Sequence, residues 1–551
     1  MQAKPAKWWG WGFDDRSTPL ESRPGLHAYL RQALELRDGD PLGVPNLESL
    51  ALSPPQLPES DLAFFHKIID EERLSSAPIE RLAHAMGKSY RDLLRLRLGD
   101  IPMLPDLVVY PETEEEIRAL LEHCSERRIG VIPFGGGTGV VGGVEVSDES
   151  RSHVTLDVRG MRRVLEVDAV SLLAMAQAGI RGPLLEEALN GQGLTAGHFP
   201  QSFEFSTLGG WIAARAAGAL SNRYGKIEDI VAGVRLIAPT GVLDVHGRPR
   251  HAMGPDLLSL VVGSEGTLGV ISQATIRVHR VPESRAFDSF LFHTFDEGLD
   301  AIRRMAQDGV LPPMTYLFDE DETRLVFAAA GGPKGHGALN DLGIRVLRWR
   351  GFSFEQGSLL LLGFEGTRGV VRSARKLGRA HCGGAASAGA SPAIRWTEER
   401  YGSPYLRDSL IEHRIMVDTV ETATTWSNLE RLHKAAREAI LNAIWSSGVF
   451  GIVGCHVSHV YSEGASLYFT WMAPQKRGEE LAQFDAVKAA VIRAFLETGG
   501  HLSHHHGIGI EHARYLREAI GPEAVRLIGD LKRTLDPNSV MNPGKLVPVS
   551  G

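Results

Sequence analysis

The stretch VIPFGGGTGVVGG, residues 131–143, joins a short apolar segment to a run of glycines. Its glycines at 137, 139 and 142 have the spacing G-x-G-x-x-G, and Asp157 follows in the chain, as in dinucleotide-binding Rossmann units. A Rossmann unit begins a helix inside the glycine run, whereas the loop-forming stretch GGVEVSDESRSH follows here. We therefore do not expect a Rossmann unit. The glycines form either a tight turn or a nest of backbone N–H groups around phosphate oxygens.

Strand-like and helix-like segments surround this loop. LVVYP (107–111) is typical of a strand, and PETEEEIRALLEHCSERRIG (111–130) of a helix that starts at Pro111 with acids in its first turn. Further strands are expected in HVTLDV (153–158), RRVLEVDA (162–169), VRLIAPTG (234–241) and VISQATIRVHR (270–280). This mixture predicts an α+β domain over residues 101–282.

The rest of the chain divides around that domain. Residues 1–100 are predicted to be mostly helical, and residues 501–551 to be helical and then extended. LLLLGFEG (359–366), IVGCHV (452–457) and SLYFTWMA (466–473) predict strands of a second, larger α+β domain over residues 283–500. A chain of 551 residues exceeds what one hydrophobic core supports, so the expected fold class is α+β with at least two domains.

Composition excludes several classes of function. The net charge is −8, from 59 basic and 67 acidic residues, which argues against a nucleic-acid binder. The three cysteines, Cys124, Cys382 and Cys455, form no C-x-x-C pair, so no disulfide framework or metal ribbon is expected and the cytoplasm is the expected compartment. No apolar run approaches the ~20 residues of a membrane span. Neither a signal peptide nor a peroxisomal C-terminal signal is expected.

Near the C-terminus, LSHHHGIG (502–509) places three consecutive histidines against a Gly-x-Gly. Histidine changes charge near neutral pH and offers two ring nitrogens, so the triplet suits acid–base chemistry, anion binding and metal ligation alike. A solvated surface turn is the alternative. Gly507 and Gly509 favour close backbone approach instead.

Several motifs occur in a fixed order along the chain: KWWGWG (7–12), PFGGGTG (133–139), QSFEFSTLGGW (201–211), NRYGKIEDIV (222–231), GSEGTLGVI (263–271), PYLRDSLIEHRIMVDTVETATTW (404–426) and LSHHHGIG. With this combination the chain resembles the alkylglycerone-phosphate synthase family of the vanillyl-alcohol-oxidase superfamily. The resemblance implies a two-subdomain FAD-binding domain and a larger α+β substrate (cap) domain. It also implies a C-terminal segment that returns to the flavin site.

The same resemblance implies site residues by their position in the family's motifs. Tyr468 of GASLYF would be the base that abstracts a proton, and His504, His505 and His506 would lie beside the flavin. Arg407 of PYLRD would bind the substrate. The flavin-contacting residues that it implies are Pro133, Phe134, Gly135, Gly136, Gly137, Thr138, Gly139, Gln201, Ser202, Phe203, Glu204, Phe205, Ser206, Thr207, Ala214, Arg215, Ala216, Ala217, Glu265, Gly266, Thr267, Leu268, Gly269, Val270 and Ile271.

The resemblance further implies a reaction. The family exchanges the acyl group of acyl-dihydroxyacetone phosphate for a fatty alcohol, a redox-neutral step of ether lipid synthesis. We therefore expect FAD, these two lipid substrates, a homodimer, peripheral membrane contact at most, and no metal. The glycine loop offers no histidine for covalent attachment, so the FAD is expected to be non-covalent, with His198 the first residue to examine otherwise. Because tyrosine has a reference pKa near ~10, we expect nearby histidines to lower the pKa of Tyr468.

Plainer interpretations of these residues stay open. Tyr468 suits a strand as an ordinary aromatic residue, and Arg407 suits a surface ion pair. Trp8, Trp9 and Trp11 are expected to pack the N-terminal segment on the core rather than to act in catalysis. A catalytically silent flavin-binding module would be a third class of function.

An FAD-linked oxidase or dehydrogenase of a 2-hydroxy acid or alcohol is the main alternative. Such relatives hold a metal through H-x-G-D-G-N-x-H and E-H-G-I-G motifs. Here HVSHVYSEGASLY keeps His456 but lacks D-G-N, and His505 replaces the glutamate. Conversely, MTYLFD has Tyr316 where the synthases have an arginine, and Ile510 and His512 stand where they have basic residues. Two cations that would hold a phosphate are therefore missing from the expected positions.

Overall fold

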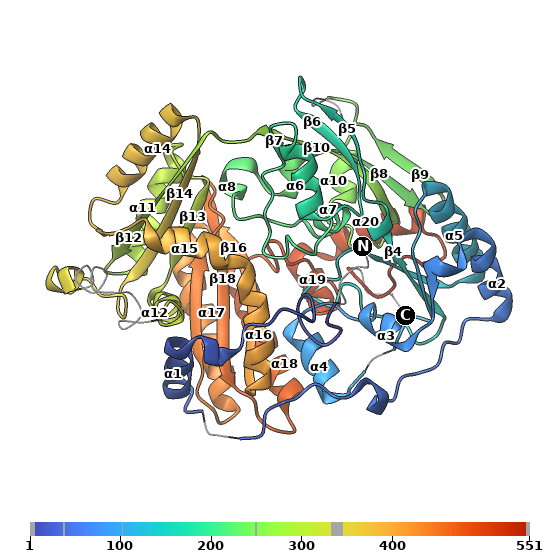
Figure 1. The fold of residues 1–551 in the computed structure, drawn as a ribbon, viewed down its shortest axis with the longest axis horizontal. Helices are drawn as coiled ribbons and strands as arrows, with labels where there is room; N and C mark the ends of the chain where they lie inside the picture. The colour runs from blue at the N-terminus through green and yellow to red at the C-terminus, as the bar shows by residue number, and fades with distance from the viewer. Residues whose placement is uncertain are drawn as a thin grey trace.

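The structure is a computed structural model that describes residues 6–36, 39–101, 103–247, 249, 251–331 and 345–546. Figure 1 shows two halves side by side. One half carries the smaller sheets, built from residues 74–280, and the other carries one large sheet, built from residues 284–474. The expected mixture of helices and strands is confirmed.

A four-stranded sheet carries the glycine loop. Its order is β1-β2-β4-β3, with β1 (Leu74–Ser75), β2 (Leu107–Val109), β3 (Gly130–Phe134) and β4 (His153–Asp157). Strands β3 and β4 are parallel, yet the described loop between them contains no helix. This confirms that the glycine spacing does not mark a Rossmann unit.

A five-stranded antiparallel sheet lies beside it, in the order β5-β6-β10-β8-β9. Its strands are β5 (Val164–Asp168), β6 (Leu173–Gln177), β8 (Val231–Ala238), β9 (Gly241–Val245) and β10 (Val270–Arg277), and the short strands β7 (Leu194–Thr195) and β11 (His279–Arg280) pair separately. The first long helix of this half, α5 (Glu114–Arg127), begins after a capping box at Thr113 and not at Pro111 as expected. The Thr113 side chain accepts a hydrogen bond from the Glu116 N–H, which satisfies one of the free amides of the helix end.

The other half is organised around a seven-stranded antiparallel sheet in the order β15-β12-β14-β13-β17-β18-β16. Its strands are β12 (Ser284–Phe292), β13 (Met314–Phe318), β14 (Ser358–Gly366), β15 (Ala386–Gly389), β16 (Ile415–Thr425), β17 (Ile452–Val457) and β18 (Gly464–Pro474). Strand β14 is buried along its whole length because helices and neighbouring strands cover both of its faces. The strands that the sequence predicts in LLLLGFEG, IVGCHV and SLYFTWMA are thus confirmed.

Helices surround both sets of strands (Figure 1). The helices that precede strand β12 in the chain, besides α5, are α1 (Pro24–Ala33), α2 (Glu59–Ile68), α3 (Pro78–Ala83), α4 (Tyr90–Leu98), α6 (Gly182–Asn190), α7 (Leu208–Ala214), α8 (Ser221–Tyr224), α9 (Ile227–Ile230) and α10 (Leu257–Val261). The later helices are α11 (Phe295–Gln307), α12 (Glu320–Ala329), α14 (Arg368–His381), α15 (Ser391–Glu399), α16 (Ser403–Glu412), α17 (Trp426–Ser446), α18 (Glu480–Thr498), α19 (Ala513–Ile520) and α20 (Pro522–Leu535). Of the helices that precede β12, α1 packs against α12 in the half that carries the large sheet (Figure 1). Among the described residues, none of these helices has the length and apolar character to cross a membrane.

Candidate functional site

The histidine triplet lies in the loop between α18 and α19, and a buried carboxylate holds that loop. Glu421 on β16 accepts hydrogen bonds from the peptide N–H groups of His504 (2.5 Å), His505 (3.0 Å) and His506 (2.8 Å), and from the Ser503 hydroxyl (2.7 Å). Burial opposes its ionisation, but these hydrogen-bond donors favour the carboxylate and hold the pKa of Glu421 well below its ordinary value. The triplet is therefore fixed through its backbone, so its side chains are not needed to hold the loop in place.

A second carboxylate fastens the next part of the same loop to the other half of the molecule. Glu265 accepts hydrogen bonds from the N–H groups of Ile508 (2.6 Å) and Gly509 (2.7 Å). Gly509 has a left-handed φ of 52°, and a Cβ there would lie 2.0 Å from the Val141 carbonyl oxygen. Only glycine fits this approach, so the close backbone approach expected at Gly509 is confirmed.

Tyr468 lies on β18, directly opposite Glu421 in the strand register. Its ring stacks on His456, with centroids 4.7 Å apart, and also lies near His505 (6.0 Å) and His506 (5.5 Å). Its hydroxyl donates to Thr419 Oγ1 at 3.0 Å. The structure thus brings Tyr468 and the triplet together, as the sequence predicts.

The expectation that these histidines lower the pKa of Tyr468 is wrong. Burial raises the pKa of Tyr468, and nearby carboxylates add to the rise, while the hydrogen bond to Thr419 opposes it. The histidines do not compensate, because burial also lowers the pKa of His504 to about 3 and the pKa of His505 well below its ordinary value. Neutral rings provide no positive charge that would stabilise a phenolate.

Arg407 lies on α16, close enough to Tyr468 for the two side chains to interact electrostatically. Its Nε and Nη2 atoms are buried, and neither has a hydrogen-bond partner among the described residues. Burial lowers the pKa of Arg407, whereas the charges of Asp408, Asp418 and Tyr468 raise it. A guanidinium stays protonated in proteins, and leaving its buried donors unpaired is costly. This arrangement suits the binding of an anion.

A lysine that sequence reasoning missed lies near Arg407. The Lys88 peptide N–H donates to the Gly139 carbonyl of the glycine loop at 2.7 Å, and its Nζ donates to the Lys7 carbonyl at 3.1 Å. Burial lowers the pKa of Lys88 to about 8; Asp408 raises it, and Arg407 lowers it further. The single residue in the turn between α3 and α4 gave no sequence signal, because only the fold brings this turn to the glycine loop.

The N-terminal loop supports Arg407 from outside. The Trp11 peptide N–H and the Lys7 Nζ both donate to the carboxylate of Asp408, at 3.0 and 3.2 Å. The Trp11 ring lies edge-on to Phe205, with centroids 5.6 Å apart. The tryptophan-rich segment therefore packs the N-terminus on the core, as expected for Trp11, and it links α16 to the loop at 201–207.

The loops that the resemblance assigns to the flavin lie against one another. A Cβ on Gly136 would lie 2.2 Å from the Phe205 carbonyl oxygen, so these two loops touch through their backbones. The Glu265 N–H donates to the Ala213 carbonyl at 2.9 Å, which places residues 265–271 beside residues 214–217. The C-terminal segment returns here as well: Asn542 Nδ2 donates to the carbonyls of Gly143 (2.9 Å) and Glu265 (2.7 Å).

Similarity to known proteins extends over nearly the whole chain. Residues 105–245 match the family of FAD binding domains, and residues 281–546 match the C-terminal domain of FAD linked oxidases. Alkyldihydroxyacetonephosphate synthase of Dictyostelium discoideum is 33% identical over 98% of this chain and 93% of its own. The chain belongs to the alkyldihydroxyacetonephosphate synthase family. The enzyme of the same name from Trypanosoma brucei brucei is 34% identical over 90% of this chain and 82% of its own.

A solved synthase structure shares the whole architecture. It superposes with a TM-score of 0.85 at 32% identity and covers 98% of both chains. The predicted fold class, an FAD-binding domain followed by a larger α+β domain, is thereby confirmed. The family of the predicted resemblance is confirmed as well.

The cofactor of this synthase family member is FAD, and the glycine loop fits it. None of the peptide N–H groups of residues 135–141 donates to an acceptor among the described residues. Consecutive free N–H groups on a glycine-rich backbone form a nest for phosphate oxygens. Of the two interpretations of the glycine run, this geometry favours the nest, with Gly135 to Gly139 as the residues that would hold the pyrophosphate.

The histidines of this family member could also hold a metal ion. Ring nitrogens of His459, His504 and His505 all lie within 4.8 Å of one another. However, His504 Nδ1 is 3.0 Å from His505 Nδ1, and its Nε2 is 2.6 Å from the Tyr461 hydroxyl, so both of its nitrogens are engaged. His456, the residue kept from the dehydrogenase motif, instead pairs with Glu322 at 2.8 Å. The absence of a metal remains a prediction for this protein.

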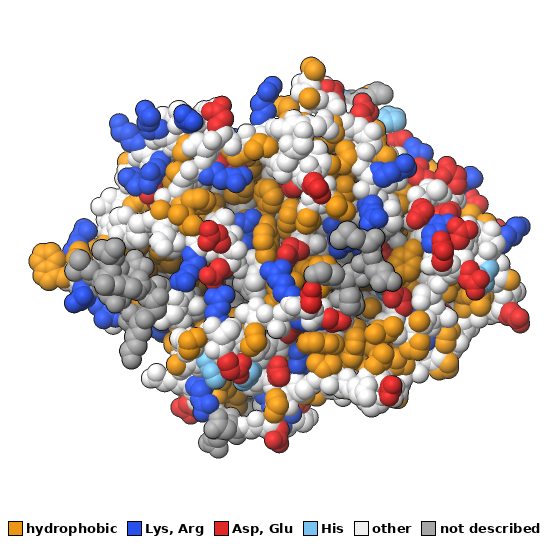
Figure 2. Space-filling model, in the orientation of Figure 1, with side chains coloured by type: hydrophobic (Ala, Val, Ile, Leu, Met, Phe, Trp, Pro, Cys, Tyr) orange, Lys and Arg blue, Asp and Glu red, His pale blue; other side chains and the backbone are white. Residues whose placement is uncertain are grey.

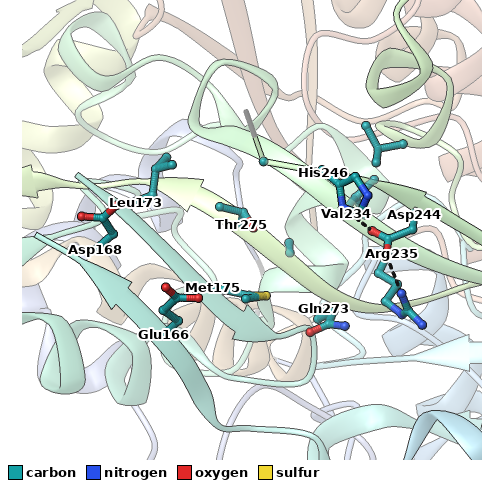
Figure 3. Close-up of a pocket in the computed structure, with 13 residues that line it drawn as sticks. Glu166, Asp168, Leu173, Met175, Val234, Arg235, Asp244, His246, Gln273 and Thr275 are labelled. Carbon is teal, nitrogen blue, oxygen red and sulfur yellow. Dashed lines mark hydrogen bonds and ion pairs between the residues drawn. The ribbon is translucent and has the colours of Figure 1, made fainter. Parts of the chain in front are cut away.

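One conspicuous pocket lies away from these residues. It has a volume of about 350 Å³ on the five-stranded sheet and is lined by Glu166, Asp168, Arg235, Asp244 and His246, among others (Figure 3). Arg235 and Asp244 form an ion pair with each other there. None of the residues predicted for the synthase site lines this pocket.

Proposed function

We propose that the protein exchanges the acyl group of acyl-dihydroxyacetone phosphate for a fatty alcohol, as an FAD-dependent alkylglycerone-phosphate synthase. The observation that carries this proposal is the buried guanidinium of Arg407, whose Nε and Nη2 have no partner among the described residues. Its charge interacts with Tyr468, whose ring lies near His505 and His506, in a member of the synthase family. Such a cation suits a site that binds a phosphate ester, because an arginine can hold phosphate through two parallel hydrogen bonds.

Two cations would hold the phosphate. Arg407 offers its planar fork, and Lys88, whose charge interacts with that of Arg407, offers a second positive group from the glycine-loop side. Together they supply the positive charge that Ile510 and His512 do not provide at the positions where basic residues are expected. When bound, FAD would supply an electrophilic ring for the exchange at the substrate carbon.

Tyr468 and the triplet would handle protons. The Tyr468 hydroxyl, like any tyrosine, is protonated at neutral pH, and burial raises its pKa further. It therefore needs an acceptor for its own proton when it takes one from the substrate, and the neutral rings of His505 and His506 lie beside it. This assigns Tyr468 and the two histidines to one proton path.

An apolar pocket would take the hydrocarbon chains. It has a volume of about 690 Å³ and is lined mainly by Val326, Phe327, Leu347, Leu359, Leu361 and Trp396. Burying a methylene group contributes roughly 0.8 kcal/mol, so a long chain is held there without specific contacts. The ring of Trp396 lies 4.0 Å from that of Tyr316, which in turn lies 5.8 Å from His456 beside Tyr468.

One assay separates this function from the oxidoreductase alternative. Incubation with acyl-dihydroxyacetone phosphate and hexadecanol should yield alkyl product and free fatty acid, without oxygen uptake or dye reduction. The missing D-G-N core favours this outcome, since a metal site that would orient a 2-hydroxy acid is incomplete. Dye reduction by D-lactate or another 2-hydroxy acid, with no ether product, would establish the alternative.

Peripheral membrane contact belongs to this proposal. Trp349 is 87% exposed and Val346 47% exposed, next to Arg348 and Arg350, and Val346 and Arg350 also line the apolar pocket. Figure 2 shows Lys and Arg side chains gathered over the end of the molecule that carries α14 in Figure 1. Such a surface suits anionic lipid. Sedimentation with phosphatidylserine vesicles should fall for Trp349→Ala and stay unchanged for Trp445→Ala, a control on another exposed tryptophan.

The assembly and the compartment are further parts of the proposal. We propose a homodimer and a cytoplasmic location; the free, buried thiols of Cys124, Cys382 and Cys455 suit a reducing compartment. Sedimentation velocity at micromolar concentration tests the dimer. Fluorescence microscopy of the tagged chain tests the compartment.

A further inference from the structure

The resemblance to the synthase family implies an arginine on strand β13 that this chain does not have. Tyr316 occupies that position, is 8% exposed and packs between Trp396 and His456. The exchange proposed above has two anionic groups to hold, the phosphate of the substrate and the carboxylate of the departing fatty acid. Arg407 and Lys88 can serve the first, so the second requires a cation elsewhere.

Arg400 lies where such a cation is needed. It begins the short helix η6 (Arg400–Gly402) and lines the apolar pocket together with Trp396. Its positive charge acts on the Tyr316 hydroxyl: burial raises the pKa of Tyr316, and Arg400 opposes that rise. Arg400 is thus the arginine next to the position that Tyr316 fills.

The guanidinium of Arg400 is held by two hydrogen bonds and has one buried donor, Nε, without a partner among the described residues. Nη1 donates to the Thr397 carbonyl at 3.1 Å, and Nη2 donates to the Tyr401 hydroxyl at 2.7 Å. Nε is buried and has no partner among the described residues. Two anchored nitrogens and one free donor orient a charge for an incoming oxygen.

Other arginines of the same pocket are less suitable. Arg350 is exposed to solvent. Arg23 and Arg395 both pair with the carboxylate of Glu399, at 2.8 and 3.2 Å. Their charges are already compensated, and 45% of the Arg395 side chain is exposed to solvent. Exposed pairs of this kind contribute little to holding a further anion.

We propose that Arg400 binds the carboxylate of the fatty acid at the end of the apolar pocket nearest Tyr316. The inference rests on the proposed function. In the exchange, the bond between the dihydroxyacetone carbon and the ester oxygen breaks, and its electron pair leaves on the carboxylate. The alcohol oxygen takes its place on that carbon and releases its proton. Arg400 stabilises the negative charge that develops on the departing oxygen.

Binding of the fatty acid product tests this without turnover. Calorimetric titration of the FAD-loaded protein with hexadecanoate should give about 10- to 100-fold weaker binding for Arg400→Gln, the loss expected for one charge-assisted contact. Binding of hexadecanol should stay unchanged. Arg303→Gln on α11, an exposed arginine outside the pocket, is the charge control. Equal hexadecanoate affinity in Arg400→Gln and the unmodified protein, or loss in Arg395→Gln alone, would overturn the inference.

A charge swap gives a second test. Tyr316→Arg in the Arg400→Gln background should restore hexadecanoate binding, because it returns a cation to the same end of the pocket. If Arg400→Gln does not fold, the unmodified protein can be tested with methyl hexadecanoate, which lacks the negative charge. This ester should bind about 10-fold or more weakly than hexadecanoate. Equal affinity for the two would contradict a cation at this end of the pocket. Failure of the proposed function is distinguishable, since the unmodified protein would then form no ether product and bind neither hexadecanoate nor hexadecanol.

Discussion

The carboxylate of Glu421 accepts the peptide N–H of His505 at 3.0 Å, across the junction between strand β16 and the loop that follows α18. The same carboxylate also holds the N–H groups of His504 and His506. The ring nitrogens of His505 and His506 lie 3.8 and 3.7 Å from this carboxylate, beyond hydrogen-bond distance. Glu421 therefore positions the rings through the backbone of the loop.

Changing Glu421→Gln should therefore impair catalysis while leaving the flavin in place. An amide keeps only one acceptor oxygen, and its NH₂ group would face a peptide N–H that it cannot accept. Loss of one charge-assisted hydrogen bond corresponds to about 10- to 100-fold in kcat. Steady-state kinetics and flavin absorbance check this, with Glu430→Gln on α17 as an exposed control. Unchanged kcat would show that the loop holds its histidines without this carboxylate.

Tyr468→Phe should lower kcat by about 10²–10⁴-fold, the usual range for a general acid–base group. The ring keeps its stacking on His456, so folding and flavin content should stay near normal. Tyr461→Phe, which removes a hydroxyl bound to His504, should cost less because that hydroxyl is outside the proposed proton path. Comparable activity of Tyr468→Phe and the unmodified enzyme would remove Tyr468 from the mechanism.

The affinity for the phosphate ester should depend on pH through Lys88. Its pKa is lowered to about 8, chiefly by burial, so the ammonium is present below that pH and is lost as pH rises through it. The KM for acyl-dihydroxyacetone phosphate should consequently increase above about pH 8. Lys88→Arg should move the increase to higher pH, because a guanidinium stays protonated. A KM profile that is identical in Lys88→Arg would assign the titration to another group.

The FAD should be released by denaturation. Acid precipitation followed by centrifugation should leave the yellow chromophore in the supernatant, since the glycine loop at 133–139 contains no attachment residue. His198 is buried with both ring nitrogens unpartnered among the described residues, and burial lowers its pKa to about 3. If the pellet stays yellow, peptide mapping around His198 would locate the covalent link.

Metal removal should not affect the exchange. The cluster of His459, His504 and His505 contains no carboxylate, and both nitrogens of His504 are engaged by neighbours. Dialysis against EDTA should leave the rate of ether formation unchanged within about twofold, because none of the proposed steps uses a Lewis acid. Loss of activity that Zn²⁺ restores would make this cluster a metal site.

Much of the fold followed from local patterns, whereas several site contacts did not. The strands around the glycine loop depend on neighbouring residues, so their positions could be predicted within a few residues, whereas the helix predicted to start at Pro111 begins only after the cap at Thr113. Glu421 escaped prediction because its partners lie 82 to 85 residues further along the chain and meet it only through the sheet register. Lys88 and Arg400 escaped for the same reason. The pKa of Tyr468 was predicted in the wrong direction because sequence does not reveal the depth of burial, which outweighs neighbouring rings here.

The grip of the N-terminal loop on Asp408 has a practical consequence for anyone who produces this protein. Lys7 and Trp11 donate hydrogen bonds to Asp408, the residue next to Arg407. A fusion partner or deletion that disturbs residues 7–12 would therefore change the position of the Arg407 guanidinium. Such a preparation would be impaired although every catalytic side chain is present, and the loop at 201–207 would be disturbed as well, because Trp11 packs against Phe205. Its weak activity would resemble a genuine substitution in the catalytic machinery. An affinity handle is therefore better placed away from this end.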